Sequence, residues 1–131
     1  EIHGTVREVM CMACGERAAM ERALDRVRAG EADPPCRSCG GILKSATISF
    51  GQNLVGDDLR RAETAARGCD LFLALGTTLT VFPVAALPGT ALEAGARLVI
   101  ANAEPTPYDP QADAVLRGKL GDVLPELVAL V

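Results

Sequence analysis

Cys11-Met12-Ala13-Cys14 and Cys36-Arg37-Ser38-Cys39 form two Cys-x-x-Cys pairs that are separated by twenty-one residues. This spacing is typical of a four-thiolate zinc site in which each pair lies on a short turn, or knuckle. A glycine follows each pair, Gly15 after the first and Gly40 after the second. Glycine adopts the positive φ that a tight turn behind the second sulfur requires. The two pairs therefore predict a small zinc-ribbon module over residues 6–46.

Two disulfides or unrelated thiols would also fit this pattern. Disulfide frameworks belong to small secreted domains without a real core, whereas this chain has 131 residues of which 49% are hydrophobic. A reduced zinc site is therefore favoured. The pattern implies no open coordination position, so we expect the zinc to be structural. The fifth cysteine, Cys69, leads into an apolar run and is interpreted as a small buried residue.

The charge of the chain bears on its partners. The formal net charge is −4, and it falls to about −6 when four thiolates bind one divalent cation. No run of lysine or arginine offsets this negative charge, so we predict no direct binding of nucleic acid. The sequence has no signal peptide and no apolar stretch of membrane-spanning length. We therefore predict a cytoplasmic protein that does not associate with membranes.

The first half of the chain contains two helical patterns and one short strand. Residues 16–29 favour a helix whose buried face consists of Ala19, Met20, Ala23, Leu24 and Val27. Pro34-Pro35 ends this pattern. Residues 46–50 predict a short strand, and residues 57–67 predict a second helix with Gly68 at its carboxyl end.

Two continuous apolar runs, residues 71–75 and 98–101, predict parallel strands covered by helices on both faces. A helix-length segment separates them, so together they form a βαβ unit whose ligand site lies beyond the carboxyl ends of the strands. Residues 76–78 and 102–104 occupy those ends, and their small, hydroxyl and amide side chains suit a nucleotide. The alternative is that Thr78 and Asn102 only cap turns or helices. Residues 122–130 predict a short amphipathic helix that closes the layer.

The sheet is expected to be incomplete. No Gly-x-Gly-x-x-Gly motif occurs in the chain, although a complete dinucleotide-binding fold needs this motif or an equivalent phosphate loop at its first strand–helix turn. The sequence opens on Glu1-Ile2-His3-Gly4, which is typical of the end of a strand. We therefore expect that further chain precedes Glu1 in a longer protein.

The ordered motifs resemble the carboxyl-terminal half of the sirtuins, the NAD-dependent protein-lysine deacylases, over essentially all 131 residues. The matching segments are His3-Gly4-Thr5, the two knuckles, residues 40–44, 49–54, 70–71, 76–85 and 102–107. The resemblance implies an α/β fold, with a partial Rossmann-like parallel sheet and a small four-cysteine zinc-ribbon module. It assigns residues 1–5 to the end of the catalytic-histidine strand, 6–46 to the zinc module and 47–131 to the carboxyl-terminal half of the NAD-binding domain.

The resemblance also implies roles for individual residues. His3 matches the catalytic histidine, a general base on the nicotinamide ribose, and the zinc ligands match Cys11, Cys14, Cys36 and Cys39. The NAD-binding positions match Gly76, Thr77, Thr78, Asn102, Ala103, Glu104 and Leu120. The positions that hold the acylated peptide as an added strand match Ile48, Phe50, Gly51 and Gln52.

Two residues depart from the family pattern, because Gln52 replaces the usual glutamate and Thr78 replaces the usual serine. The expected function is removal of acyl groups from protein lysines with NAD, giving nicotinamide and O-acyl-ADP-ribose. The phosphate loop and nicotinamide segment of the family are absent from the chain, so we expect it to be inactive alone and to self-associate through its incomplete sheet. The alternatives are a non-catalytic zinc-containing interaction module and a mono-ADP-ribosyltransferase.

Overall fold

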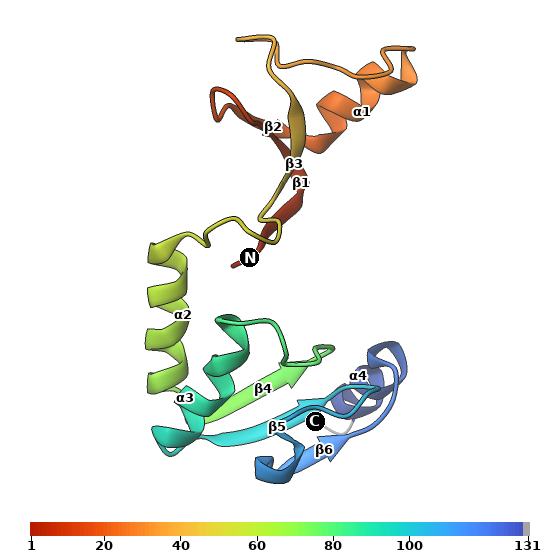
Figure 1. Cartoon of the computed structure of the whole chain (residues 1–131). Helices are drawn as coiled ribbons and strands as arrows, with labels where there is room; N and C mark the ends of the chain where they lie inside the picture. The colour runs from red at the N-terminus through yellow and green to blue at the C-terminus, as the bar shows by residue number, and fades with distance from the viewer. Residues whose placement is uncertain (130–131) are drawn as a thin grey trace. The chain divides into compact units, whose positions relative to one another are not determined.

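The structure is a computed structural model that describes residues 1–129. It divides into two compact units, Glu1–Val55 (unit 1) and Gly56–Val131 (unit 2) (Figure 1). Unit 1 includes residues 47–55, which the family resemblance assigns to the NAD-binding domain. The division into three functional segments stays a prediction. Within the described residues, no helix has the length and apolar character needed to cross a membrane.

Unit 1 is built on a three-stranded antiparallel sheet with the strand order β2-β1-β3. Its elements are β1 (Gly4–Cys11), β2 (Arg17–Ala19), α1 (Met20–Arg28) and β3 (Leu43–Thr47). The predicted helix over 16–29 starts later than expected, because residues 17–19 pair with β1. The predicted strand over 46–50 lies earlier, because residues 43–47 pair with the other edge of β1.

The predicted buried face of α1 is wrong except at Ala23. Leu24 and Val27 remain 37% and 45% exposed. The helix turns Arg26 toward the knuckle instead, where the guanidinium donates to the Pro35 carbonyl oxygen at 2.7 Å and forms a paired contact with Glu31. These three polar contacts cannot be deduced from apolar spacing, because they depend on the loop that follows the helix.

Unit 2 is a three-stranded parallel sheet with the order β4-β5-β6. The strands are β4 (Leu71–Leu75), β5 (Arg97–Ala101) and β6 (Ala114–Leu116). The helices are α2 (Gly56–Gly68), α3 (Leu87–Glu93) and α4 (Leu120–Val128), with short turns η1 (Val84–Ala86) and η2 (Asp109–Gln111). The predicted parallel strands and crossover helix are confirmed. The last helix begins two residues before its predicted start, and residue 130 lies outside the described residues.

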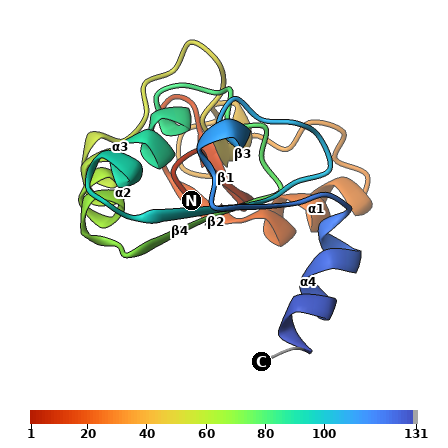
Figure 2. The same cartoon turned by 90° about the horizontal axis from the view of Figure 1, so that it is seen from below.

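The two faces of the unit 2 sheet differ. One face buries Ala74, Leu98 and Ile100 beneath the α3 layer, whereas Leu71, Leu73 and Leu75 on the other face are 47%, 54% and 41% exposed. Figure 2 shows α2 and α3 on one side of the sheet. The β4 leucines are therefore the apolar surface that the incomplete sheet was expected to leave open, and only one face is covered as the continuous apolar runs predict.

Asp113 joins β5 to the chain that enters β6. Its Oδ2 atom accepts a hydrogen bond from the Leu98 N–H at 2.8 Å, and its own N–H donates to the Leu98 carbonyl oxygen at 2.8 Å. The Leu98 N–H, together with Arg97, holds the pKa of the Asp113 carboxyl below its ordinary value. Ionised Asp113 therefore stabilises the folded state.

We predict that Asp113→Asn lowers the melting temperature of the chain at neutral pH by a few degrees. A carboxyl with a lowered folded-state pKa contributes stability above its unfolded pKa of about 3.9, and this contribution is lost as the pH falls through the folded-state pKa. The variant should therefore lose less stability than the unsubstituted chain between pH 5 and pH 3. Thermal melts over this pH range test this prediction, with Glu126→Gln, a substitution of an exposed glutamate, as the control. Identical pH profiles for all three proteins would contradict it.

Candidate zinc and nucleotide sites

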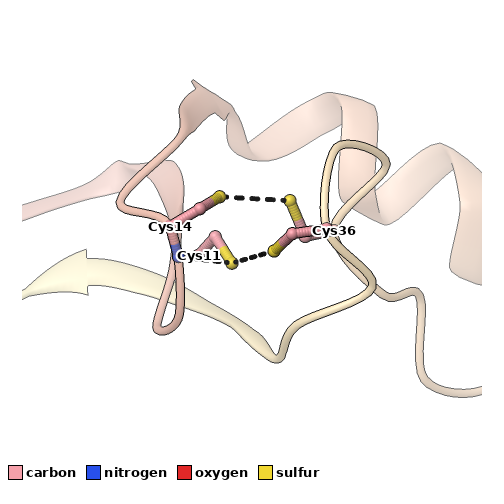
Figure 3. A group of neighbouring side chains, drawn as sticks. Cys11, Cys14 and Cys36 are labelled. Carbon is pink, nitrogen blue, oxygen red and sulfur yellow. Dashed lines mark hydrogen bonds between the residues drawn. The ribbon is translucent and has the colours of Figure 1, made fainter.

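The four cysteines of the two knuckles meet at one point of unit 1. Their sulfur atoms all lie within 4.8 Å of one another. The Sγ atoms of Cys11 and Cys39 are 3.5 Å apart, and those of Cys14 and Cys36 are 3.7 Å apart (Figure 3). The first knuckle follows β1 and the second precedes β3, so pairing of these strands brings the knuckles together.

This cluster fits a zinc ion. In a tetrahedral site with Zn–S bonds of about 2.3 Å, neighbouring sulfurs are about 3.8 Å apart, close to both measured separations. Gly15 and Gly40 have φ of +75° and +73°, as the turn argument predicts. Gly41 instead leaves room for the sulfur atoms, because a Cβ atom there would lie 3.0 Å from the Cys11 Sγ and 3.2 Å from the Cys39 Sγ. The four cysteines are therefore placed to bind a structural zinc.

Two of the thiols have clear electrostatic partners. The N–H groups of Cys14 and Ala13 donate to the Cys11 Sγ at 3.5 and 3.4 Å and lower the pKa of that thiol to about 6. Cys36 donates instead to the Glu16 carboxylate at 3.1 Å, and this contact and burial raise the pKa of the Cys36 thiol. Zinc binds thiolates, so this proton must leave when the metal binds. Glu16 stands two residues after Cys14 but belongs to no motif, so the sequence did not predict this role.

A cavity of about 380 Å³ lies beside this cluster, between α1, the sheet and the second knuckle. Val9, Ala23 and Leu43 supply apolar parts of its lining, and Arg22 and Arg37 supply charged parts. None of the predicted NAD or peptide residues lines it. The cavity is therefore separate from the predicted nucleotide and peptide sites.

His3, the predicted catalytic residue, lies exposed in the turn that precedes β1. Its carbonyl oxygen accepts a hydrogen bond from the Ile48 N–H at 2.8 Å, so it adjoins the start of the predicted peptide segment. The neighbouring Gly4 has a φ of +77°, and a Cβ atom there would lie 2.1 Å from the Ala46 carbonyl oxygen. Only glycine fits this position, and the tight approach holds the turn that contains His3 against β3.

The predicted peptide segment forms a turn that Gln52 closes. The Gln52 Oε1 atom accepts from the Ser49 N–H at 2.8 Å and lies 3.5 Å from the Lys44 Nζ. The Gln52 N–H donates in return to the Ser49 carbonyl oxygen at 3.0 Å. Phe50 at the tip is 95% exposed. A glutamate could accept the same bonds, so Gln52 keeps the turn and removes one charge.

The predicted nucleotide residues gather at the carboxyl edge of the unit 2 sheet. Gly76 follows β4 with a φ of +64°, and its N–H donates to the Ala101 carbonyl oxygen at 2.9 Å. A Cβ atom at Gly76 would lie 2.5 Å from the Leu120 Cδ1, so the first segment touches the start of α4. Asn102 is only 8% exposed, and its N–H donates to the Leu116 carbonyl oxygen at 3.1 Å.

The loop after β4 is held in an uncommon conformation. Leu79 has a φ of +54°, a region that bulky residues rarely adopt, and its side chain is buried in the core beside Leu98 and Ile100. Its N–H donates to the Thr77 hydroxyl at 3.2 Å, and the hydroxyls of Thr78 and Thr80 are 2.9 Å apart. Thr78 thus makes a contact within the turn, as the alternative interpretation predicts. Its side chain also remains exposed at the predicted nucleotide site.

Comparison with known proteins identifies relatives for the whole chain. The model of the Sir2 family matches residues 1–83. NAD-dependent protein deacetylase 2 of Streptomyces coelicolor is 50% identical over 128 residues, which are 98% of this chain and 53% of that protein. An NAD-dependent protein deacetylase of Rhodopseudomonas palustris is 43% identical over 125 residues, or 95% of this chain and 49% of the relative.

A solved structure described as Sir2 with a p53 peptide and NAD+ has the same fold. It is 28% identical, with a TM-score of 0.88, and the match covers 99% of this chain and 54% of that protein. The chain thus spans about half the length of the curated relatives and of the solved structure that it matches.

Proposed function

Because the chain belongs to the Sir2 family, we propose that it supplies the catalytic histidine, the zinc module and part of the nucleotide site of an NAD-dependent protein-lysine deacylase. The observation that carries this proposal is the hydrogen bond from the Ile48 N–H to the His3 carbonyl oxygen. It joins the candidate base to the segment proposed to hold the acylated peptide. His3 belongs to unit 1, and the proposed NAD residues belong to unit 2.

In the proposed reaction, the acyl oxygen of the substrate lysine displaces nicotinamide from the ribose of NAD. The His3 imidazole takes the proton from a hydroxyl of that ribose, a task for which enzymes use histidine most often. The oxygen of that hydroxyl then attacks the acyl carbon, and one water molecule adds as the bond between the acyl carbon and the lysine nitrogen breaks, so that the products are nicotinamide, O-acyl-ADP-ribose and the free lysine. Zinc, held by the four cysteines, stabilises the fold of unit 1 and takes no part in the chemistry.

The proposed substrates are recognised by different segments. The chain from Ile48 to Gln52, which is exposed from Ser49 onward, is proposed to pair with the acylated peptide, so that main-chain hydrogen bonds give affinity. Gly76, Thr77, Thr78, Asn102, Ala103, Glu104 and Leu120 are proposed to meet the adenosine side of NAD. The cytoplasm, where thiols stay reduced, is the proposed location.

A second candidate is a non-catalytic module that binds a partner protein. The uncharged Gln52 and the exposed Phe50 favour it, because the first departs from the family pattern and the second offers an apolar contact. A mono-ADP-ribosyltransferase is a further alternative that differs from the deacylase in its product.

A chimera separates these candidates. The chain replaces the matching region of the Streptomyces coelicolor relative, whose remaining sequence supplies the part that this chain does not span. The chimera is incubated with an acetylated peptide, with and without NAD. NAD-dependent loss of the acetyl group supports the deacylase, whereas a folded, zinc-containing chimera that leaves the peptide acetylated supports the binding module. Transfer of ADP-ribose to a protein as the main reaction would support the mono-ADP-ribosyltransferase.

We also propose that the chain self-associates through the uncovered face of its unit 2 sheet. Leu71, Leu73 and Leu75 form an apolar row there, and such rows drive association. We predict that Leu73→Gln reduces dimers and larger species, measured by size-exclusion chromatography with light scattering. Leu24→Gln, which changes an exposed leucine of unit 1, is the control. Unsubstituted protein that remains monomeric at about 0.1 mM, well inside the range of weak association, would contradict the proposal.

A further inference from the structure

Arg117 bridges three groups at the carboxyl edge of the unit 2 sheet. Its Nη1 atom donates to the carbonyl oxygens of Asn102 at 3.2 Å and Glu104 at 2.9 Å. Its Nη2 atom pairs with the carboxylate of Asp109. The Arg117 side chain is 38% exposed and the Asp109 side chain 22% exposed, so this ion pair is partly withdrawn from water.

Asp109 is itself held by a buried neighbour, Thr106. Its Oδ1 atom accepts from the Thr106 hydroxyl at 2.8 Å, and its N–H donates to the Thr106 carbonyl oxygen at 3.2 Å. Thr106 is 7% exposed. Burial opposes ionisation of Asp109, but the contacts with Thr106 and the charge of Arg117 hold the pKa of this carboxyl below its ordinary value. The network therefore connects the loop after β5, the turn η2 and the end of β6.

These contacts decide which groups of residues 102–104 are available to a ligand. The Asn102 Nδ2 group donates to the Glu104 carbonyl oxygen at 2.9 Å, so its side chain is used within the loop. Both bridged carbonyls face Arg117. Among the described residues, the N–H groups of Ala103 and Glu104 donate to no partner, and both residues are exposed. The edge therefore offers free donors and the Glu104 carboxylate.

We propose that Arg117 is a positioning residue of the nucleotide site, which fixes residues 102–104 so that their free N–H groups and the Glu104 side chain meet the nucleotide. This inference rests on the proposed function. Arginine suits the task because its planar guanidinium reaches two carbonyls and one carboxylate at once, whereas the single ammonium of lysine cannot span all three. Holding the loop in its bound form before the ligand arrives lowers the entropy lost on binding.

The test uses the 131-residue chain with ADP-ribose as the probe. Arg117→Gln and Arg117→Lys are compared with Arg97→Gln, a matched control that removes the Arg97 contact with Asp113 at the opposite end of β5. Nuclear magnetic resonance gives the backbone order parameters of residues 102–106 and the affinity from chemical-shift titration. Resonances of Leu98 and Ile100, which are fully buried, report whether the fold of unit 2 persists.

We expect Arg117→Gln to lower the order parameters of this loop from about 0.85, typical of rigid backbone, to about 0.6. ADP-ribose affinity should fall about tenfold. Arg117→Lys, which keeps the charge, should recover part of both losses and provides the folded comparison if Arg117→Gln unfolds. Arg97→Gln should change neither quantity.

Three results would overturn the inference. A loop that stays ordered in both Arg117 variants would show that Arg117 does not position it. A disordered loop with unchanged affinity would show that this order does not serve the nucleotide. If millimolar ADP-ribose changes no chemical shifts at the carboxyl ends of β4 and β5 in the unsubstituted chain, the proposed nucleotide site itself is wrong. The role of Arg117 in that site is then wrong too.

Discussion

Removal of zinc is expected to unfold residues 6–46 and to leave unit 2 folded. Both clusters of buried hydrophobic side chains among the described residues lie in unit 2. Unit 1 buries mainly small residues such as Ala23 and Ala46, together with Val9. Such a unit depends on its metal, because a four-thiolate site does not exist in the unfolded chain and its binding energy, about 10–16 kcal/mol in zinc-finger peptides, becomes folding energy.

Limited proteolysis during titration with a strong chelator measures this effect. Cleavage should begin within residues 6–46, and zinc release should follow the same curve. Cys36→Ser should behave like the chelated protein, whereas Cys69→Ser, which changes a cysteine outside the cluster, should keep its zinc. Metal loss with unchanged protease resistance and circular dichroism would refute the structural role.

In the Streptomyces chimera, His3→Ala is expected to lower the rate of deacylation by about 10²–10⁴-fold, the usual contribution of a general acid–base group. Binding of NAD should be nearly unchanged, because the proposed base acts on the ribose during the reaction and adds little to ground-state affinity. Gln52→Glu is the comparison variant, and it should have a far smaller effect because either side chain can accept the bonds that close the turn.

Single-turnover rates and calorimetric titration with NAD separate the two quantities. A His3→Ala chimera that keeps more than about a tenth of its rate, far above the range expected for a general base, would remove His3 from the catalytic role. Equal losses of rate and NAD affinity would instead assign His3 to binding.

Local patterns predicted the elements that depend on local chemistry. The two Cys-x-x-Cys pairs identified four sulfurs that the structure brings together. The continuous apolar runs located β4 and β5 and their parallel pairing. Gly76, Asn102 and Leu120, which the family resemblance selected, gather at one edge of the sheet.

Features that depend on contacts distant in the sequence were not predictable in the same way. β6 has only three residues, an apolar run too short to predict a strand, and it is defined by pairing with β5. The inward turn of Arg26 depends on the Pro35 carbonyl oxygen. Arg117 carries no motif, and its importance emerges only when the ends of β5 and β6 lie together. The missing phosphate loop predicted an incomplete sheet, but the apolar run of β4 did not show which of its faces stays open, because periodicity does not tell which face has a cover.

Mass spectrometry of the products formed by the chimera from NAD and an acetylated peptide tests the central claim most directly. The account predicts nicotinamide, the deacetylated peptide and O-acetyl-ADP-ribose in equal amounts, and their loss in His3→Ala. A folded, zinc-loaded chimera that forms no O-acetyl-ADP-ribose, while the unmodified Streptomyces relative does so under the same conditions, would contradict it.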